Sequence, residues 1–470
     1  MGCNTSQRKV TLNGGNQAIP NNSSCYLWKE YITTYKTLNS ANSFRVNMIK
    51  YNNKAIEFDF VKVGEKPQEG YPLYICLHDG EVSHSAFNTS EYKKMKTLYL
   101  KSITVGICLA CKGLSDQSNC HYMDESFVLV EKMIKEMIAV NDVDPNRVYL
   151  VGIGLGGDAV YQLAARLADR LAAISINSGH TYGMNLKNLV NLPIQIQVGE
   201  NDNVFEKNKN AVNSYISLLE LYKEYNLPQK ELQCNIHSGK GKHIIDYYLK
   251  KSIQNVINDP IAWLNGGDFN IEQKNVNAIT FLSQFTRCSF PNKLIWDLTK
   301  CFKSDPQNDN NALAQKKLNM PNLISKNEAQ FQMEITLSHI SGYSTMNINS
   351  ASMGTNSHFY WLEIGNKNIN EIGAVEIIAH YEKEKNKIVI ETPVKYLRVL
   401  LCQEMIDFTK NVIIEINKEE HSIQVSRSFA TERRSISERG DYSYIFSAVI
   451  EIESQDLVKY KVEQYKETIM

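Results

Sequence analysis

One segment, Val148 to Gly157 with the sequence VYLVGIGLGG, constrains the fold more than any other part of the chain. Its first half is a continuous apolar run, which predicts a strand buried on both faces. Its second half is a tight glycine-rich turn, and the residues from Asp158 to Leu167 predict a helix. A buried strand that turns directly into a helix is the repeating unit of an α/β sheet.

The neighbouring segments alternate in the same way. Apolar strands and amphipathic helices follow one another from about residue 45 to residue 265, which predicts a mostly parallel sheet with helices on both faces. The expected strands are 44–50, 55–63, 73–77, 103–110, 147–152, 171–177, 193–198 and 231–237, and the expected helices are 26–37, 124–139, 157–168 and 207–225.

Beyond about residue 275 the pattern changes to short β-branched or aromatic runs separated by turns. Such spacing predicts a C-terminal, mainly antiparallel β domain. The expected strands are 293–298, 358–364, 373–381, 387–391, 396–401, 411–416, 421–426 and 444–453. We expect Tyr360 and Trp361 in the core, and we interpret the mixed-charge stretch 432–439 as a solvated loop or a short helix.

These patterns divide the chain into four parts. Residues 1–25 form a flexible acylated tail, and residues 26–267 form the α/β domain. Residues 268–327 are a connecting segment with one strand and a polar linker, and residues 328–470 form the β-rich domain. A chain of 470 residues is long enough for two domains.

Composition excludes several classes of function. The formal net charge is zero, which gives no electrostatic basis for binding nucleic acid. The sequence contains no apolar run long enough for a transmembrane helix and no signal-peptide core. The ten cysteines form no compact framework, so we expect reduced thiols in the cytoplasm. Cys108 and Cys111, followed by Cys120 and His121, could suggest a zinc or redox site, but their apolar run favours core cysteines, and we expect no metal and no cofactor.

The N-terminal sequence Met-Gly-Cys-Asn-Thr-Ser fits the N-myristoylation pattern. The myristoyl group would be attached to Gly2 once Met1 is removed. Because one such chain binds membranes only reversibly, a second signal is needed, and Cys3 provides a palmitoylation site. We therefore expect a peripheral protein held at the cytosolic face of a membrane by lipid anchors.

Several further motifs follow in a set order. The first, His78-Asp79-Gly80, follows a strand, and the stretch from Asp142 to Tyr149 leads into the glycine-rich turn. After it come Ser178-Gly179-His180, then an acidic turn from Val198 to Val204, then Gly239-Lys240-Gly241-Lys242-His243. In this order the chain resembles the α/β-hydrolase superfamily of esterase or peptidase-like enzymes, with a β-rich C-terminal extension.

The resemblance implies a role for each matching position. The turn corresponds to the nucleophile elbow G-x-S-x-G-G, in which Gly154 stands in the place of the serine. Asp202 would orient His243, and His243 would act as the general base. Backbone N–H groups near Gly80 and at Leu155 would form the oxyanion hole.

Two departures from the pattern predict that serine-type catalysis has been lost. Gly154 has no hydroxyl group, so no acyl-enzyme can form at this position. Asp79 and Glu81 stand where esterases of this type tend to have small residues, and a carboxylate there would repel the oxyanion or crowd the substrate carbonyl. Glycine also tolerates the strained elbow backbone without a Cβ penalty.

We therefore expect a pseudo-hydrolase that serves as a membrane-tethered scaffold or interaction subunit and binds protein partners. The alternative is an active serine-type or water-activating ester or peptide hydrolase that uses His243 and Asp202, with Ser178 as another possible nucleophile. A third possibility, a small-molecule binding protein that uses the vacated pocket, overlaps the first.

Overall fold

A computed structural model describes residues 23–39, 47–51, 54–79, 90–114, 124–241, 253–298, 358–364, 376–454 and 459–465. Gly2, Cys3, Gly80, Glu81, His243 and the pair Cys120-His121 lie outside these ranges. Within the described ranges, no helix combines the length and the apolar character needed to cross a bilayer.

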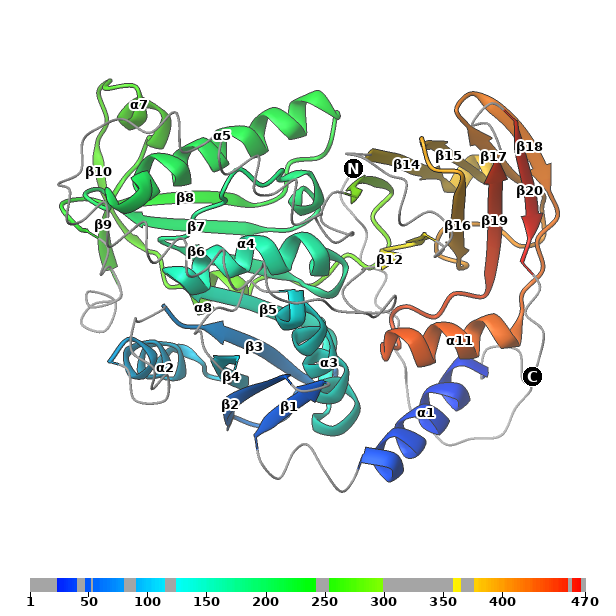
Figure 1. Ribbon diagram of the computed structural model, residues 1–470, viewed down its shortest axis with the longest axis horizontal. Helices are drawn as coiled ribbons and strands as arrows, with labels where there is room; N and C mark the ends of the chain where they lie inside the picture. Colours follow the sequence, from blue (N-terminus) through cyan, green and yellow to red (C-terminus); the bar gives the residue numbers. More distant parts are fainter. Residues whose placement is uncertain are drawn as a thin grey trace.

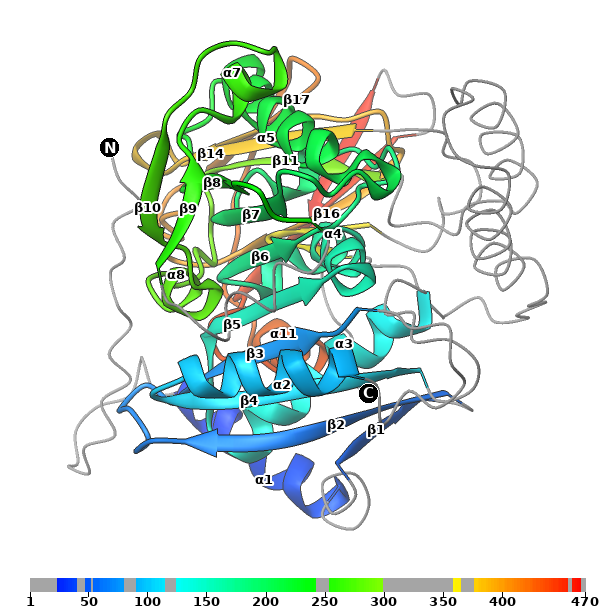
Figure 2. The ribbon, with the colours of Figure 1, turned by 90° about the vertical axis from the view of Figure 1, so that its left-hand side faces the viewer.

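The α/β unit is built on a ten-stranded sheet (Figures 1 and 2) with the strand order β1-β2-β4-β3-β5-β6-β7-β8-β9-β10. The central strands from β4 to β8 in this order pair in parallel, and antiparallel strands extend both edges. The strands are β1 (Met48–Tyr51), β2 (Lys54–Val63), β3 (Tyr71–Leu77), β4 (Gly106–Leu114), β5 (Val143–Ile153), β6 (Ala173–Asn177), β7 (Ile194–Gly199), β8 (Leu232–His237), β9 (Ile253–Ile257) and β10 (Ile271–Asn275).

Helices cover both faces of this sheet, which explains why β3, β6 and β7 are buried along their whole length. One face packs against α3 (Asp124–Asn141), α4 (Leu155–Leu167) and α5 (Lys207–Glu224). The other packs against α2 (Ser90–Ser102) and α8 (Ala278–Leu282). The expected α/β-hydrolase-type sheet is therefore confirmed. Cys108 and Cys111 lie buried in β4, as expected for core cysteines.

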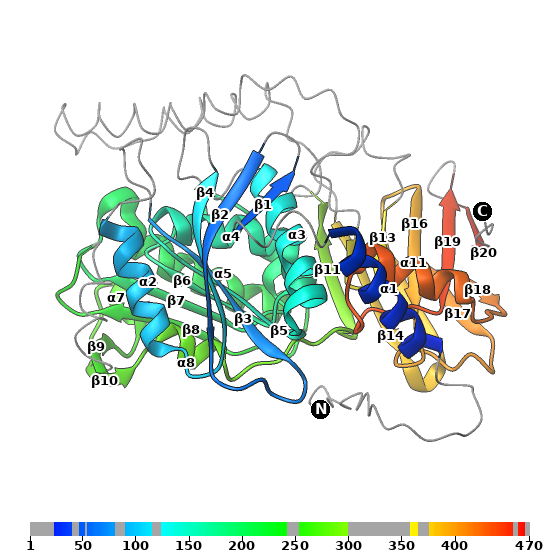
Figure 3. The same ribbon diagram turned by 90° about the horizontal axis from the view of Figure 1, so that it is seen from below.

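The C-terminal unit consists of two five-stranded sheets (Figure 3). Their orders are β11-β14-β15-β17-β18 and β12-β13-β16-β19-β20, and every pairing except β15 with β17 is antiparallel. The strands are β11 (Lys293–Asp297), β12 (His358–Phe359), β13 (Leu362–Glu363), β14 (Glu376–Glu382), β15 (Lys387–Glu391), β16 (Tyr396–Leu401), β17 (Val412–Ile416), β18 (Glu419–Ile423), β19 (Ala448–Ser454) and β20 (Tyr460–Gln464).

Several elements differ from the sequence expectations. The single strand expected at 358–364 is a hairpin of β12 and β13, with the buried pair Tyr360 and Trp361 at its turn. Of the two alternatives for the charged stretch 432–439, the short helix is the one present: the stretch belongs to α11 (Phe429–Arg439), although one face of this helix is buried rather than solvated. The sequence did not predict α2, β9, β10, α8 or β20. In the stretch assigned to the connecting segment, β10 pairs with β9, and β11 pairs with β14.

The two units share a contact surface. Helix α1 (Ser23–Asn39) packs on both α11 and α3, with Leu27 in an apolar cluster with Ile436 and Ile445. At the carboxyl end of α4, Tyr360 Oη donates to Ala168 O at 3.1 Å and Tyr444 Oη donates to Asp169 O at 2.8 Å. The β-rich unit therefore holds the end of the same helix that begins at the glycine-rich turn.

Candidate active site

The glycine-rich turn has the backbone of a nucleophile elbow. Gly154 stands between β5 and α4 with φ 58° and ψ −120°, a conformation that favours glycine because a Cβ atom is strained there. The Gly154 N–H donates to Asn177 O at 2.9 Å, and its carbonyl accepts from the Asp158 N–H at 3.0 Å. The turn is thus fixed by the end of β6 on one side and by the first turn of α4 on the other.

Gly156 is required because α4 begins in contact with β3. A Cβ atom on residue 156 would lie 2.3 Å from Leu77 O, and backbone cannot move aside as a side chain can. We expect Gly156→Ala to lower the free energy of unfolding by about 3 kcal/mol, measured by chemical denaturation. Gly267→Ala is the matched control, since its Cβ would lie 3.4 Å from Ala262 O, an ordinary contact. A fully stable Gly156→Ala protein would contradict this packing.

Asp79 occupies the place that a serine side chain would take. A Cβ atom on residue 154 would lie 2.1 Å from Asp79 Cγ and 2.1 Å from its Oδ1. The same Oδ1 accepts a hydrogen bond from the Leu155 N–H at 2.9 Å. Leu155 is the residue expected to contribute its N–H to the oxyanion hole, so the carboxylate binds the very donor that a substrate oxyanion would need.

Strand register explains how Asp79 reaches Gly154. In the parallel pair of β3 and β5, Leu77 lies opposite Gly152. Asp79 comes two residues after Leu77, and Gly154 comes two residues after Gly152, so both stand at the same level beyond the sheet. Asp79 also lies at the N-terminus of α4, where the helix dipole and a free N–H favour a carboxylate. Its side chain is almost completely buried.

Asp202, the expected triad acid, lies beyond the carboxyl end of β7 and is completely buried. Its N–H donates to Gly199 O at 3.1 Å, and its carbonyl accepts from the Asn208 N–H at 3.0 Å. This position suits an acid that orients a histidine. Because His243 and Gly80 lie outside the described residues, the pairing of Asp202 with His243 and the second oxyanion donor stay predictions.

Sequence reasoning missed a buried ion pair beside the elbow. Lys207 Nζ lies 3.3 Å from Asp158 Oδ1 and donates to Ser178 O at 2.6 Å. Asp158 also accepts from the His180 N–H at 2.6 Å and from Tyr182 Oη at 3.0 Å. Burial raises the pKa of Asp158, and Lys207 opposes that shift. The pair ties the loop after β6 and the first residue of α5 to α4. An aspartate four residues after Gly154 is the signal that could have suggested it.

Ser178, the alternative nucleophile, is buried, with φ 50°. Ser178 Oγ makes no hydrogen bond with any residue in the described ranges. The hydrogen bond from Lys207 goes to the Ser178 carbonyl and not to its hydroxyl group. A serine nucleophile needs a base within hydrogen-bond distance of its hydroxyl group. The described part of the chain supplies no such base at Ser178.

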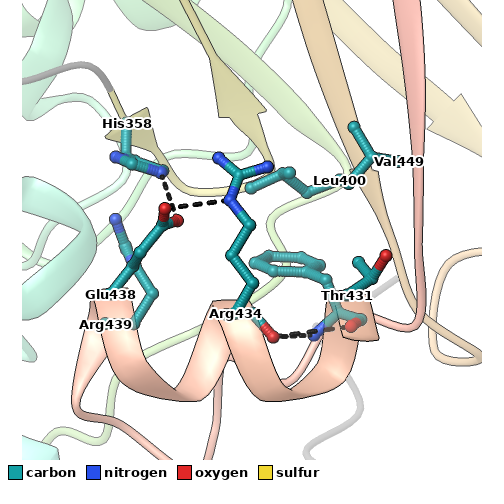
Figure 4. Close-up of a pocket in the computed structure, with 9 residues that line it drawn as sticks. His358, Leu400, Thr431, Arg434, Glu438, Arg439 and Val449 are labelled. Carbon is teal, nitrogen blue, oxygen red and sulfur yellow. Dashed lines mark hydrogen bonds and ion pairs between the residues drawn. The ribbon is translucent and has the colours of Figure 1, made fainter. Parts of the chain in front are cut away.

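A separate hollow lies in the β-rich unit, between α11 and the sheet that contains β16 and β19 (Figure 4). Its cavity volume is about 10 Å³, no more than a single water molecule needs, and neither Gly154, Asp79 nor Asp202 lines it. At its rim, Glu438 contacts Arg434 Nε at 2.9 Å and His358 Nε2 at 3.6 Å. Burial opposes ionisation of Glu438, but these two partners outweigh it and lower its pKa to about 2. Glu438 is thus bound by Arg434 and His358 of the same unit, which indicates a structural cluster of polar side chains.

Comparisons with known proteins agree with the fold. Residues 114–240 match the model of the dienelactone hydrolase family. A search of curated protein sequences gives no match.

Among solved structures, a thermostable esterase is 16% identical, with a TM-score of 0.37; the match covers 51% of this chain and 62% of the esterase. An α-β serine hydrolase homologue from Coxiella burnetii is 10% identical, with a TM-score of 0.32, and covers 45% of this chain and 94% of that chain. The dienelactone hydrolase from Anabaena variabilis is 9% identical, with a TM-score of 0.30, and covers 51% of this chain and 96% of that chain. The family model, which spans the elbow and Asp202, shows that residues 114–240 are similar to the dienelactone hydrolase family.

Proposed function

We propose that this protein is a catalytically silent α/β-hydrolase-like protein that acts as a membrane-tethered scaffold or interaction subunit. The observation that carries this proposal is the Asp79 carboxylate at Gly154. It fills the space where a nucleophile would stand and accepts the hydrogen bond of the Leu155 N–H.

The chemistry of acyl transfer explains why this arrangement supports inactivity. Serine-type hydrolysis needs a nucleophile, a base and an oxyanion hole. Gly154 supplies no nucleophile, and in subtilisin the loss of the nucleophile alone lowers turnover roughly a millionfold. Asp79 further places a negative charge where negative charge develops in the transition state.

The direct test is activity of the purified full-length protein. We expect no hydrolysis of short-chain p-nitrophenyl esters above the buffer rate and no labelling by a fluorophosphonate probe. A serine hydrolase of similar fold serves as the positive control. Labelling of any serine, located by peptide mass spectrometry, would overturn the proposal of silence.

The proposed tether rests on the N-terminal Gly2, Cys3 and Ser6. We expect Gly2→Ala to move the protein from the membrane fraction to the soluble fraction, because without the myristoyl group the chain lacks its first membrane contact. Cys3→Ser should weaken attachment without abolishing it, since one myristoyl chain still binds reversibly. Unchanged fractionation of Gly2→Ala would refute the lipid anchor without affecting the proposal about catalysis.

A second candidate function is a hydrolase that activates water through His243 and Asp202. The buried position of Asp202 at the end of β7 favours it, because that is where a catalytic acid belongs in this fold. Ester turnover that is present in the wild-type protein, absent in His243→Ala and retained in Ser178→Ala would establish this function. The two candidates therefore predict opposite results in the same assay.

A further inference from the structure

Strand β10 forms one edge of the ten-stranded sheet. Within the described residues it pairs with β9 alone, without a bulge, and it contains no proline (Figure 2). Such an edge presents a row of unpaired backbone groups to another strand.

The hydrogen-bond pattern fixes which groups point outward. The Asn258 N–H donates to Asn270 O at 3.0 Å, and the Ser238 N–H donates to Asn255 O at 3.1 Å on the other side of β9. Bonded and non-bonded pairs alternate along an antiparallel ladder. The backbone groups of Ile271, Gln273 and Asn275 therefore face away from β9.

These three residues can pair with themselves about a two-fold axis at Gln273. Gln273 would then lie opposite the partner's Gln273, and Ile271 opposite the partner's Asn275. The same register places Glu272 opposite the partner's Lys274 and Lys274 opposite the partner's Glu272. Lysine on an edge strand usually discourages pairing. Here Lys274 Nζ already lies 2.8 Å from a Glu272 carboxylate oxygen of its own strand. In the two-fold register each of these side chains also faces the opposite charge on the second copy.

Two exposed apolar side chains lie near the start of β10. Ile271 is 54% exposed, and Ile261 on α7 (Pro260–Leu264) is 36% exposed. Helix α7 lies beside the end of β9 and β10 (Figure 1). A strand pair flanked by these side chains would extend the contact beyond the backbone, as a specific interface requires.

We propose that β10 is a homodimer interface, in which two copies of this chain join their sheets edge to edge by antiparallel pairing about Gln273. This inference does not rest on the proposed function. It would place the two α/β units side by side, with β1 at the outer edges of one continuous sheet.

A charge exchange tests the register. We expect the wild-type chain to be a dimer at tens of micromolar in analytical ultracentrifugation. Glu272→Lys and Lys274→Glu should each raise the dimer dissociation constant about tenfold or more, because each places like charges opposite one another twice. The double exchange Glu272→Lys with Lys274→Glu restores opposite charges and should restore the dimer.

Gln273→Pro is an independent variant, because it removes the central outward N–H, and proline is tolerated on an edge strand. Gln273→Pro should be monomeric. At protein concentrations too low for the wild type to dimerise, it should unfold at the same temperature as the wild type. A wild-type monomer at 100 micromolar, or single reversals that dimerise as the wild type does, would overturn the proposal. A dimer that the single reversals weaken but the double exchange does not restore would exclude this register.

Discussion

Gly154→Ser is expected to lower the free energy of unfolding by about 2–6 kcal/mol. The elbow backbone costs a non-glycine residue about 1–3 kcal/mol. Overpacking adds about 1–3 kcal/mol, because the new Cβ would lie 2.1 Å from Asp79 Cγ. Chemical denaturation followed by circular dichroism measures the change. Gly154→Ala should be destabilised to a similar extent, because the clash comes from Cβ and not from the hydroxyl group.

Removal of Asp79 should relieve most of the overpacking. We expect Asp79→Gly with Gly154→Ser to be more stable than the sum of the single changes predicts, by about 2 kcal/mol, which is a typical coupling for residues in direct contact. Asp79→Gly alone should cost about 1–3 kcal/mol because the Leu155 N–H loses its acceptor. The double variant also restores a hydroxyl group beside a free oxyanion donor, so we expect fluorophosphonate labelling of the new serine.

The matched control for labelling is Asp79→Gly with Gly154→Ala, which has the same backbone and space but no hydroxyl group. Labelling of the serine variant alone would locate the reaction at position 154. Additive stabilities would contradict contact between the two positions. Additivity together with an unlabelled double variant would mean that Asp79 does not fill the nucleophile site.

Much of the α/β unit could be predicted because its signals are local. The apolar runs of β3 and β5 and the glycine-rich turn each lie within a few residues, and both faces of the sheet are buried. The parallel register that brings Asp79 level with Gly154 is not local. From the sequence, Asp79 was expected only to disturb the oxyanion loop, whereas it also occupies the nucleophile's place.

Helix α11 shows where the sequence pattern left two alternatives, a solvated loop or a short helix. Helix α11 has few apolar residues, and it is held by the buried polar groups Glu432, Ser435 and Arg439, whose partners Ser447, Phe446 and Asp169 all lie outside the helix. A charged segment with distant partners has the same local sequence as a solvated loop. For the same reason β10 was missed, since four of its five residues are polar and mostly exposed.

A buried cluster of charges joins the two units at the carboxyl end of α4. Asp441 Oδ2 contacts Arg170 Nη1 at 3.1 Å and Arg287 Nη2 at 2.8 Å, and all three side chains are almost fully buried. Arg439 contacts Asp169, and the guanidinium groups of Arg287 and Arg439 lie 4.6 Å and 4.5 Å from the centre of the Tyr444 ring. The cluster draws on residues that follow α4, on Arg287 between α8 and β11, and on residues at and after the end of α11.

Asp441→Asn is therefore expected to lower the free energy of unfolding by about 3–5 kcal/mol, because two guanidinium groups would lose a buried counter-charge. Burial opposes ionisation of Asp441, but Arg287 and Arg170 outweigh it and hold its pKa below the usual value. A carboxyl group with a lowered folded-state pKa stabilises the fold above its unfolded pKa of about 3.9, and this contribution is lost as pH falls through the folded pKa. The deficit of Asp441→Asn should thus be full at pH 7 and shrink below about pH 4.

Glu463→Gln is the control, since it breaks an exposed ion pair with Lys461 in the same unit and should cost less than about 1 kcal/mol. Because the cluster ties α4 to the β-rich unit, we also expect scanning calorimetry of the wild type to give one cooperative transition. If Asp441→Asn unfolds in two separate steps, the cluster is what couples the units. If it loses no more stability than Glu463→Gln, the ion pairs are compensated elsewhere, and the units are held together by the apolar contacts of α1 with α11.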